Sequence, residues 1–249
     1  MIYLKKIIKF FFGKMGYGIS PLVLTTEEDI IPEYADQKKI VGSDNITIFD
    51  VGAHHGQTST LYNTLFKKAS IYSFEPSPDS FEILKKNIEN YSNIKPINNA
   101  LGNICGKVVF NVNKSSQTNS LLKTDRDGEK TWGENLLNTI DVINIDCITI
   151  DEFVEKNEID CIDILKLDTQ GTEYQVIEGA ANTIAKNKIK LIYLEIITMP
   201  TYSGQKHFDE ILLLLRNKEF NLFNLYNYSH TGTGALRQVD AIFVHKSFQ

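Results

Sequence analysis

Cysteine is scarce in this chain, which holds only Cys105, Cys147 and Cys161. They form no CxxC pair, and no histidine stands at zinc-finger spacing from them, so the sequence excludes a zinc finger and a disulfide-stapled secreted domain. A sparse, odd set fits a reducing compartment. We therefore predict a cytoplasmic protein in which all three cysteines are small buried hydrophobic residues.

An excess of basic residues is also missing. The chain has 26 lysines and arginines against 31 aspartates and glutamates, a formal net charge of −5. Proteins that bind nucleic acid generally present a basic face, so we predict no nucleic-acid partner.

Long apolar runs are absent as well, and no stretch approaches the roughly 20 residues that span a bilayer. Lysines interrupt the apolar N-terminus and no small-residue cleavage site follows, which argues against a signal peptide. Leu4, Ile8, Phe11 and Met15 recur at helical spacing, which predicts an amphipathic helix over residues 2–15. This helix either packs on the domain or contacts the anionic inner face of a membrane.

The 249 residues are 42% hydrophobic, which suits one globular domain with extensions. From Ile46 on, apolar segments alternate with helical ones, the pattern of a mainly parallel sheet covered on both faces. We predict a doubly wound α/β domain over residues 46–249, preceded by the N-terminal helix and a lead-in over residues 1–45. The predicted strands are 46–50, 70–75, 94–98, 107–112, 139–148, 163–168 and 190–196, with 220–226 and 239–245 as a closing pair that adds an antiparallel strand. The predicted helices are 57–67, 78–90, a short helix with a Thr149–Glu152 capping box, one that begins near Glu173, and 205–218.

Five of the predicted strands end in polar residues: Asp50, Glu75, Asn98-Asn99, Asp168 and Glu195. Ligands of such sheets bind beyond the carboxyl ends of the strands, near the switch in strand order. A purely structural protein has no reason to end five strands in this way. The sequence therefore predicts a ligand site at this edge of the sheet.

The segment Asp50-Val51-Gly52-Ala53-His54-His55-Gly56 follows the first of these strands. Its GxxxG spacing permits a sharp turn but differs from the GxGxxG of nicotinamide-binding proteins, and it lacks the lysine of a P-loop. The Asp50 carboxylate would repel a pyrophosphate but suits a cationic amino-acid ligand, which favours S-adenosylmethionine. We expect this cofactor to contact Asp50, Gly52, Ala53, Gly56, Gln57 and Thr58.

Two later strand ends complete the predicted cofactor site. Glu75, followed by Pro76, is placed to accept hydrogen bonds from both ribose hydroxyls; a helix N-terminal charge is its alternative role. Asn99, Ala100 and Leu101 would lie near the adenine, with Asn99 at the ring edge and Leu101 on its face.

Lys166 and Asp168 are two residues apart on a predicted strand, so their side chains share one face. A lysine inside a central strand is costly unless paired, and Asp50 or Glu195 on the neighbouring strands are its candidate partners. We expect either a Lys166–carboxylate cluster beneath the reacting groups or a purely structural ion pair.

Six segments between residues 50 and 245 carry a family resemblance. They are DVGAHHG (50–56), SFEPSPDSFEIL (73–84), NNALG (98–102), ILKLDTQGTEYQVIEGA (164–180), LIYLEI (191–196) and VDAIFVH (239–245). In this order they resemble the FkbM-type methyltransferases. The resemblance implies a Rossmann-like class I methyltransferase fold, S-adenosylmethionine as cofactor, and methylation of a hydroxyl oxygen. The chain departs from the common family pattern at His54, where Asn is usual, and at Gln170, where Glu is more frequent.

A methyl transfer to a hydroxyl group needs an aligned acceptor and benefits from a general base. We expect Asp168 to be this base, with Glu195 next, His54 and the His230 of a Tyr-rich stretch as further candidates, and Lys166 among the catalytic residues. Asp168 and Glu195 are also hard ligands for a divalent metal, an alternative that we do not favour because a third ligand is not evident.

The acceptor is expected to contact residues 113–138 and 198–206, where Trp132 and Tyr202 are candidates for stacking. The resemblance implies a small-molecule or glycan substrate, either a sugar hydroxyl or a secondary metabolite. Abundant Lys, Asn and Ile, typical of an AT-rich bacterial genome, favour a surface glycan or its precursor. The rival classes are a nicotinamide-dependent oxidoreductase and a non-catalytic cofactor-binding module.

Overall fold

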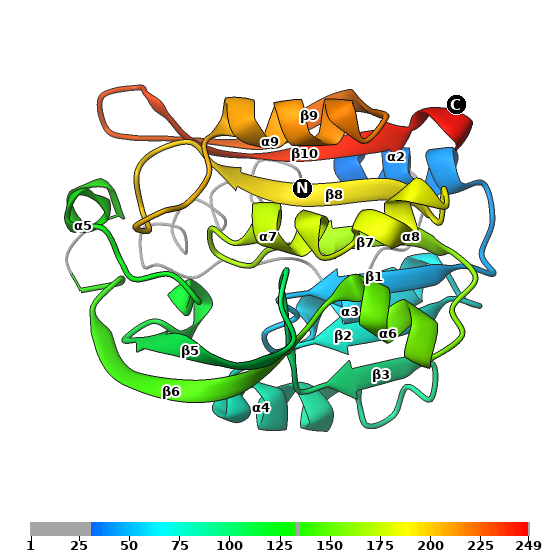
Figure 1. The fold of residues 1–249 in the computed structure, drawn as a ribbon, viewed down its shortest axis with the longest axis horizontal. Coiled ribbons are helices and arrows are strands. Elements are labelled where there is room, and N and C mark those ends of the chain that lie inside the picture. Colours follow the sequence, from blue (N-terminus) through cyan, green and yellow to red (C-terminus); the bar gives the residue numbers. More distant parts are fainter. Residues whose placement is uncertain (1–30, 133–134, 249) are drawn as a thin grey trace, which may run out of the picture. The chain divides into compact units, whose positions relative to one another are not determined.

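A central sheet of seven strands organises the computed structural model, which describes residues 31–132 and 135–248. The helix predicted over residues 2–15 lies outside these residues. Asp36–Gln249 forms one compact unit. The strand order is β3-β2-β1-β7-β8-β10-β9 (Figure 1). The strands are β1 (Thr47–Val51), β2 (Ser70–Phe74), β3 (Ile94–Ile97), β7 (Ile162–Leu167), β8 (Ile189–Ile197), β9 (Phe220–His230) and β10 (Leu236–His245).

The strand directions confirm the predicted fold class. β3, β2, β1, β7 and β8 pair in parallel, and the order reverses between β1 and β7. β10 is antiparallel to both of its neighbours, β8 and β9. This is a mostly parallel α/β sheet with an antiparallel closing strand, and the reversal creates the crevice in which such folds bind ligands.

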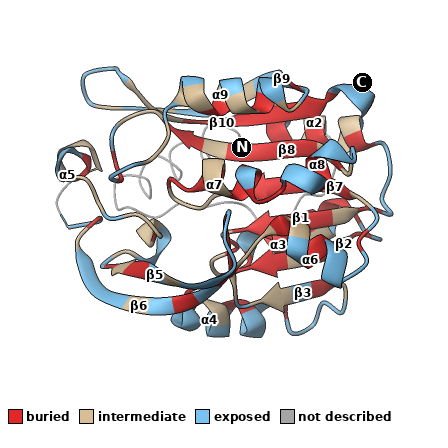
Figure 2. Ribbon diagram, viewed as in Figure 1, coloured by how far each residue is buried: buried red, intermediate tan, exposed pale blue. Residues whose placement is uncertain are grey.

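Helices cover both faces of this sheet. They are α2 (Pro32–Val41), α3 (Gln57–Leu65), α4 (Pro78–Ile88), α6 (Ile150–Lys156), α7 (Glu173–Glu178), α8 (Ala181–Ala185) and α9 (Phe208–Asn217). Apolar side chains of α6, α7, α8 and α9 join Phe49 and Leu165 in one core cluster. Ile48 and Ile164, which precede Phe49 and Leu165 in their strands and point to the other face, are also fully buried. Figure 2 shows that β8 and β10 are likewise mostly buried. Strands buried on both sides explain their near-continuous apolar sequences.

A second, smaller sheet has the order β4-β6-β5. It consists of β4 (Ala100–Leu101), β5 (Gly106–Asn113) and β6 (Thr139–Ile148). The two long strands are antiparallel and extend away from the main sheet (Figure 1). The polar segment between them contains the short helices η2 (Ser116–Thr118) and α5 (Arg126–Trp132), which the sequence analysis did not predict.

Local signals set several element boundaries. α4 begins at Pro78, after Ser77 as N-cap, and Thr149 Oγ1 accepts a hydrogen bond from the Glu152 amide at the start of α6. α2 was missed within the predicted lead-in, although Pro32 at its first position is a helix-start signal. The predicted helix 205–218 begins only at Phe208, and the closing strands are longer than predicted.

The predicted burial of all three cysteines was only partly right. Cys147 is buried and Cys161 half-buried, but Cys105 is exposed. Cys105 Sγ lies 2.6 Å from Glu152 Oε2, so this thiol faces a carboxylate at the surface instead of the core. None of the described helices is long and apolar enough to cross a membrane.

The turn between β1 and α3 depends on Gly52. Its φ is +74°, and a Cβ atom there would overlap the Asp168 carbonyl oxygen. We predict that Gly52→Ala lowers the free energy of unfolding by about 2–4 kcal/mol, since strain and overlap add. Gly204→Ala is the matched control, because Gly204 has a similar φ of +84° but open space around it, and it should cost about 1 kcal/mol. Equal losses in urea denaturation would contradict the role of the overlap.

Candidate functional site

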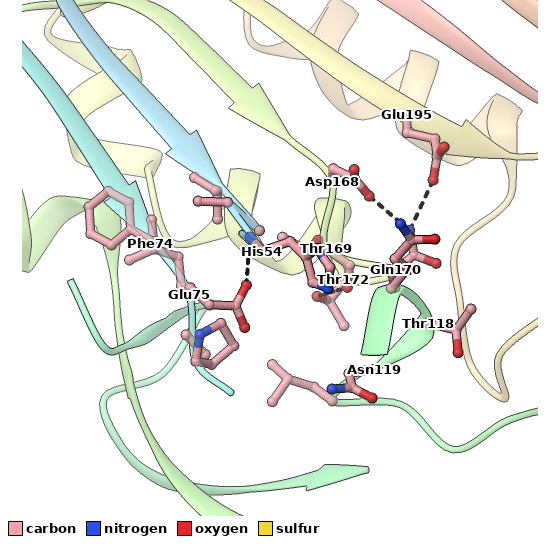
Figure 3. A pocket seen from close by; sticks show the side chains of 18 of the residues that line it. His54, Phe74, Glu75, Thr118, Asn119, Asp168, Thr169, Gln170, Thr172 and Glu195 are labelled. Atoms are coloured by element: carbon pink, nitrogen blue, oxygen red, sulfur yellow. Dashed lines mark hydrogen bonds between the residues drawn. The ribbon is translucent and has the colours of Figure 1, made fainter. Parts of the chain in front are cut away.

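A cavity of about 370 Å³ opens at the carboxyl ends of β1, β2, β7 and β8. Its size is that of a small-molecule site, and its position is the one expected for a doubly wound sheet. Among its lining residues are the predicted site residues Gly52, Ala53, His54, Gln57, Thr58, Glu75, Pro76, Asn99, Ala100, Leu101, Lys166, Asp168 and Glu195. Side chains from separate strand ends and from η2 meet there (Figure 3).

The β1–α3 turn forms one wall of the cavity. The backbone N–H groups of Gly52 and Ala53 both donate to the Phe74 carbonyl at 3.0 Å, which fixes the turn against the end of β2. His54 follows with a φ of +49°. Gly56, predicted to contact the cofactor, does not line the cavity; it is the left-handed N-cap of α3 and faces Leu84.

Glu75 presents a buried carboxylate to the same wall. Its Oε2 atom accepts a hydrogen bond from the His54 amide at 2.8 Å (Figure 3). Its Oε1 atom accepts one from the Ser77 amide at 2.9 Å. Burial raises the pKa of Glu75 to about 7, although these two hydrogen bonds oppose the rise. Each oxygen accepts only one N–H, so each retains capacity for a further donor.

The third strand end supplies an apolar wall. Ala100 and Leu101 line the cavity beside Phe74 and Phe110, with Asn99 as the polar neighbour. Asn98, the other amide of this strand end, does not line the cavity. Its Nδ2 atom donates to the Glu75 carbonyl at 2.8 Å, so it holds the β2 strand end in place.

Lys166 lies beneath the cavity and is paired with Asp50. The distance from Lys166 Nζ to Asp50 Oδ1 is 3.0 Å, and Nζ also donates to the Gly52 carbonyl at 3.1 Å. Asp50 Oδ2 accepts a hydrogen bond from Ser59 at 2.6 Å. Of the two partners considered for Lys166, the structure therefore selects Asp50 and not Glu195.

This pairing corrects the role assigned to Asp50. The Asp50 carboxylate is fully buried and does not line the cavity, whereas its partner Lys166 does. The negative charge predicted to face a cationic ligand is thus already compensated within the protein. Lys166 itself is 3.8 Å from Asp168 Oδ2, which places a cation next to the cavity carboxylates.

Asp168 and Glu195 face the cavity from the ends of β7 and β8 (Figure 3). Gln170 Nε2 donates to both, at 2.8 Å to Asp168 Oδ1 and 3.1 Å to Glu195 Oε2. Gln238 Nε2 donates to the other oxygen of Glu195 at 2.8 Å. Burial, followed by repulsion from Asp168, raises the pKa of Glu195 well above its usual range.

Polar residues of the long β5–β6 segment form the opposite wall. Ser116, Gln117, Thr118 and Asn119 line it together with Trp132, whose Nε1 donates to Thr201 Oγ1 at 2.7 Å. His54 Nε2 lies 2.9 Å from Ser116 Oγ, so the segment touches the β1–α3 turn.

The other predicted aromatic and histidine candidates are placed elsewhere. Tyr202 is buried behind the lining, where its hydroxyl lies 3.0 Å from Gln170 Oε1. Tyr226, Tyr228 and His230 lie on β9 and do not line the cavity. Burial lowers the pKa of His54 to about 4, which makes it a weak proton acceptor.

Gln238, Thr169 and Thr172 also line the cavity, although the sequence analysis did not select them. The signal for Gln238 was available: β10 is antiparallel, so its first residues lie beside the carboxyl end of β8. Among the residues described, no group of three or more His, Cys, Asp or Glu side chains is arranged to hold a metal ion.

Comparison with known proteins finds a protein family whose profile matches most of this chain. The profile of the methyltransferase FkbM domain matches residues 50–222. The hexuronic acid methyltransferase AglP of Haloferax volcanii is 25% identical over 174 residues, 70% of this chain and 63% of AglP. The 2-O-methyltransferase NoeI of Sinorhizobium fredii is 25% identical over 178 residues, 69% of this chain and 72% of NoeI. The match thus spans less than two thirds of AglP.

Two solved structures of low sequence identity align with most of this chain. The precorrin-6y C5,15-methyltransferase of Geobacter metallireducens has a TM-score of 0.46 and 12% identity, over 93% of this chain and 94% of its own. An rRNA methylase of Streptococcus thermophilus has a TM-score of 0.47 and 10% identity, over 87% and 98% of the two chains.

The buried Lys166–Asp50 pair generates a stability prediction. Lys166→Met leaves the fully buried Asp50 charge without its cation and should lower the free energy of unfolding by about 3–5 kcal/mol. The double variant Asp50→Asn/Lys166→Met removes both charges and should regain most of this loss. Urea denaturation of the three proteins measures both effects. A double variant no more stable than Lys166→Met would show that the pair is not the cause.

Proposed function

The chain belongs to the FkbM methyltransferase family, and we propose that it is an S-adenosylmethionine-dependent O-methyltransferase. Its acceptor in this proposal is a sugar hydroxyl of a glycan or glycan precursor. The observation that carries the proposal is the shared cavity: Glu75, suited to ribose hydroxyls, and the Asp168–Glu195 pair, suited to accepting a proton, open onto the same space.

The residues present fit the proposed cofactor. Glu75 retains hydrogen-bonding capacity on both oxygens, which matches a ribose diol, and the apolar wall of Phe74 and Leu101 suits a flat ring. Asn99 supplies a polar group beside that wall. With Asp50 compensated by Lys166, the cofactor's amino-acid end would instead meet Asp168 and the backbone of the β1–α3 turn.

The opposite wall supports a sugar as the acceptor. It presents neutral hydroxyls and amides, namely Ser116, Gln117, Thr118 and Asn119, together with the aromatic side chain of Trp132. Such groups match an acceptor rich in hydroxyls. The names of the two curated relatives, a hexuronic acid methyltransferase and a 2-O-methyltransferase, agree with this substrate class.

When bound, S-adenosylmethionine supplies a methyl group on a positive sulfur, a good leaving group. The protein aligns the acceptor oxygen and takes its proton as the new C–O bond forms and the C–S bond breaks. We assign this proton transfer to Asp168, the more exposed carboxylate, with Glu195 as its partner. Lys166 and Gln170 hold Asp168 in position.

Cofactor binding should depend on pH through Glu75. Ribose hydroxyls donate hydrogen bonds to the ionised carboxylate of Glu75. In the protein without cofactor, the pKa of this carboxylate is about 7. Affinity for S-adenosylhomocysteine should be full above pH 8 and fall about tenfold by pH 6, as protonation of Glu75 competes. Calorimetry from pH 6 to 8.5 measures this. Glu75→Gln should bind S-adenosylhomocysteine weakly and with an affinity that does not change with pH. The unmodified protein should not bind NAD. If the affinity of the unmodified protein did not change with pH, the assignment of Glu75 to the ribose would be refuted.

The activity test is a screen for S-adenosylhomocysteine release with sugar nucleotides, oligosaccharides and aromatic hydroxyl compounds as acceptors. We expect turnover with sugars, and Asp168→Asn should lower kcat by about 10²–10⁴-fold when the assay is saturated with cofactor. Asp146→Asn, an exposed carboxylate on β6 outside the cavity, is the control and should keep full activity. Turnover confined to aromatic acceptors would contradict a sugar substrate, and full activity of Asp168→Asn would transfer the base role to Glu195.

A further inference from the structure

The side chain of Gln170 lies between the two carboxylates of the cavity (Figure 3). Its single nitrogen, Nε2, is within hydrogen-bond distance of both Asp168 Oδ1 and Glu195 Oε2. A primary amide carries two N–H groups, so each carboxylate receives one. A neutral group thus joins the ends of β7 and β8 at the point where two negative charges meet.

The direction of this amide is fixed by its other contacts. The Tyr202 hydroxyl lies 3.0 Å from Gln170 Oε1, and the Ser120 hydroxyl donates to the Gln170 backbone carbonyl at 2.7 Å. Turning the amide over would set its oxygen against both carboxylates, and the hydrogen-bond network therefore determines which end is the nitrogen.

The backbone is held in an unfavoured conformation to place this side chain. Gln170 has a φ of +55°, in the left-handed region, and Gly171 follows with +98°. The fully buried Glu173 carboxylate accepts hydrogen bonds from the amides of Thr169 and Gly171 on either side of Gln170. Such conformations persist only where the surroundings enforce them, and they gather at functional sites.

The charges around Asp168 and Glu195 are mostly negative, so the two carboxylates need a hydrogen-bond donor between them. Glu195 accepts hydrogen bonds from two neutral amides, those of Gln170 and Gln238. It forms no ion pair within the part of the chain that the structure describes. Lys166 is closer to Asp50 than to Asp168. The other titratable groups that face the two carboxylates come from the surrounding elements: His54, Glu173, Tyr202 and Asp240. Most of them add negative charge when ionised.

We propose that Gln170 is the positioning residue of this carboxylate pair. Its two N–H groups stabilise the ionised forms of Asp168 and Glu195 side by side, and the second oxygen of Asp168, Oδ2, remains available to the acceptor hydroxyl. The proposal rests on the proposed function. The hydroxyl proton passes to a carboxylate oxygen as the methyl group moves to the acceptor oxygen, and Gln170 neither gains nor loses a proton.

Gln170→Met tests this role, because methionine has a similar length but no N–H groups. Without the donors, the pair binds a proton more readily, so the acid limb of the kcat/KM profile should move up by about one pH unit. This corresponds to about a fivefold loss of rate at the original midpoint and about a tenfold loss one pH unit below it. Gln175→Met, which removes an amide of α7 that does not line the cavity, is the matched control and should leave the midpoint unchanged.

A second readout does not require turnover. Difference infrared spectroscopy follows the protonated carboxyl band as pH falls, and its loss in Asp168→Asn/Glu195→Gln identifies the pair. The band should appear at higher pH in Gln170→Met than in the unmodified protein. Gln170→Glu retains the size of the side chain and an oxygen for Tyr202, but it adds a third carboxylate. The band should therefore appear at a still higher pH in this variant. It replaces Gln170→Met in the test if the methionine variant does not fold.

The outcomes separate the two claims. Coincident midpoints in the unmodified protein and both Gln170 variants would overturn the positioning role, whatever the activity. Absence of methyl transfer to every acceptor would overturn the proposed function, while the infrared titration would still report on Gln170. Thermal denaturation and S-adenosylhomocysteine calorimetry on each variant establish that the comparison is made between folded proteins with a cofactor site.

Discussion

The buried contact between Lys166 and Asp50 is the interaction on which the site depends. The two residues are direct partners in the parallel pairing of β1 and β7, the strands between which the sheet order reverses. One ammonium group contacts the Asp50 carboxylate and the Gly52 carbonyl and lies near Asp168. Because a buried charge needs its partners, the turn, the strand and the cavity carboxylate cannot shift independently.

Much of the architecture could be predicted from the sequence, because it follows from local signals. Apolar runs and caps located most of the strands and helices, and the polar strand ends identified the edge where the cavity lies. Glu75 was expected at this edge because it ends the second strand of the sheet, and it lines the cavity. The family segments supported the same arrangement independently.

The partners of each charge could not be predicted in the same way. A sequence shows that Asp50 ends a strand, but not that its carboxylate forms an ion pair with Lys166 inside the protein. His230 was expected beyond the end of the strand predicted over residues 220–226, whereas β9 extends to it as an edge strand. The role of Gln170 depends on a left-handed backbone that nothing in its own identity specifies, and on Tyr202, which lies 32 positions further along the chain.

Trp132 is the only tryptophan of the chain and lines the cavity on the side formed by the segment between β5 and β6. It stacks with Arg237, whose guanidinium carbon is 4.3 Å from the ring centre, and its indole N–H is bonded to Thr201. The protein therefore carries a single indole fluorophore, placed in the lining of the cavity. We expect its emission to change when a bound molecule displaces water from this side of the cavity, so fluorescence can follow occupancy without a label.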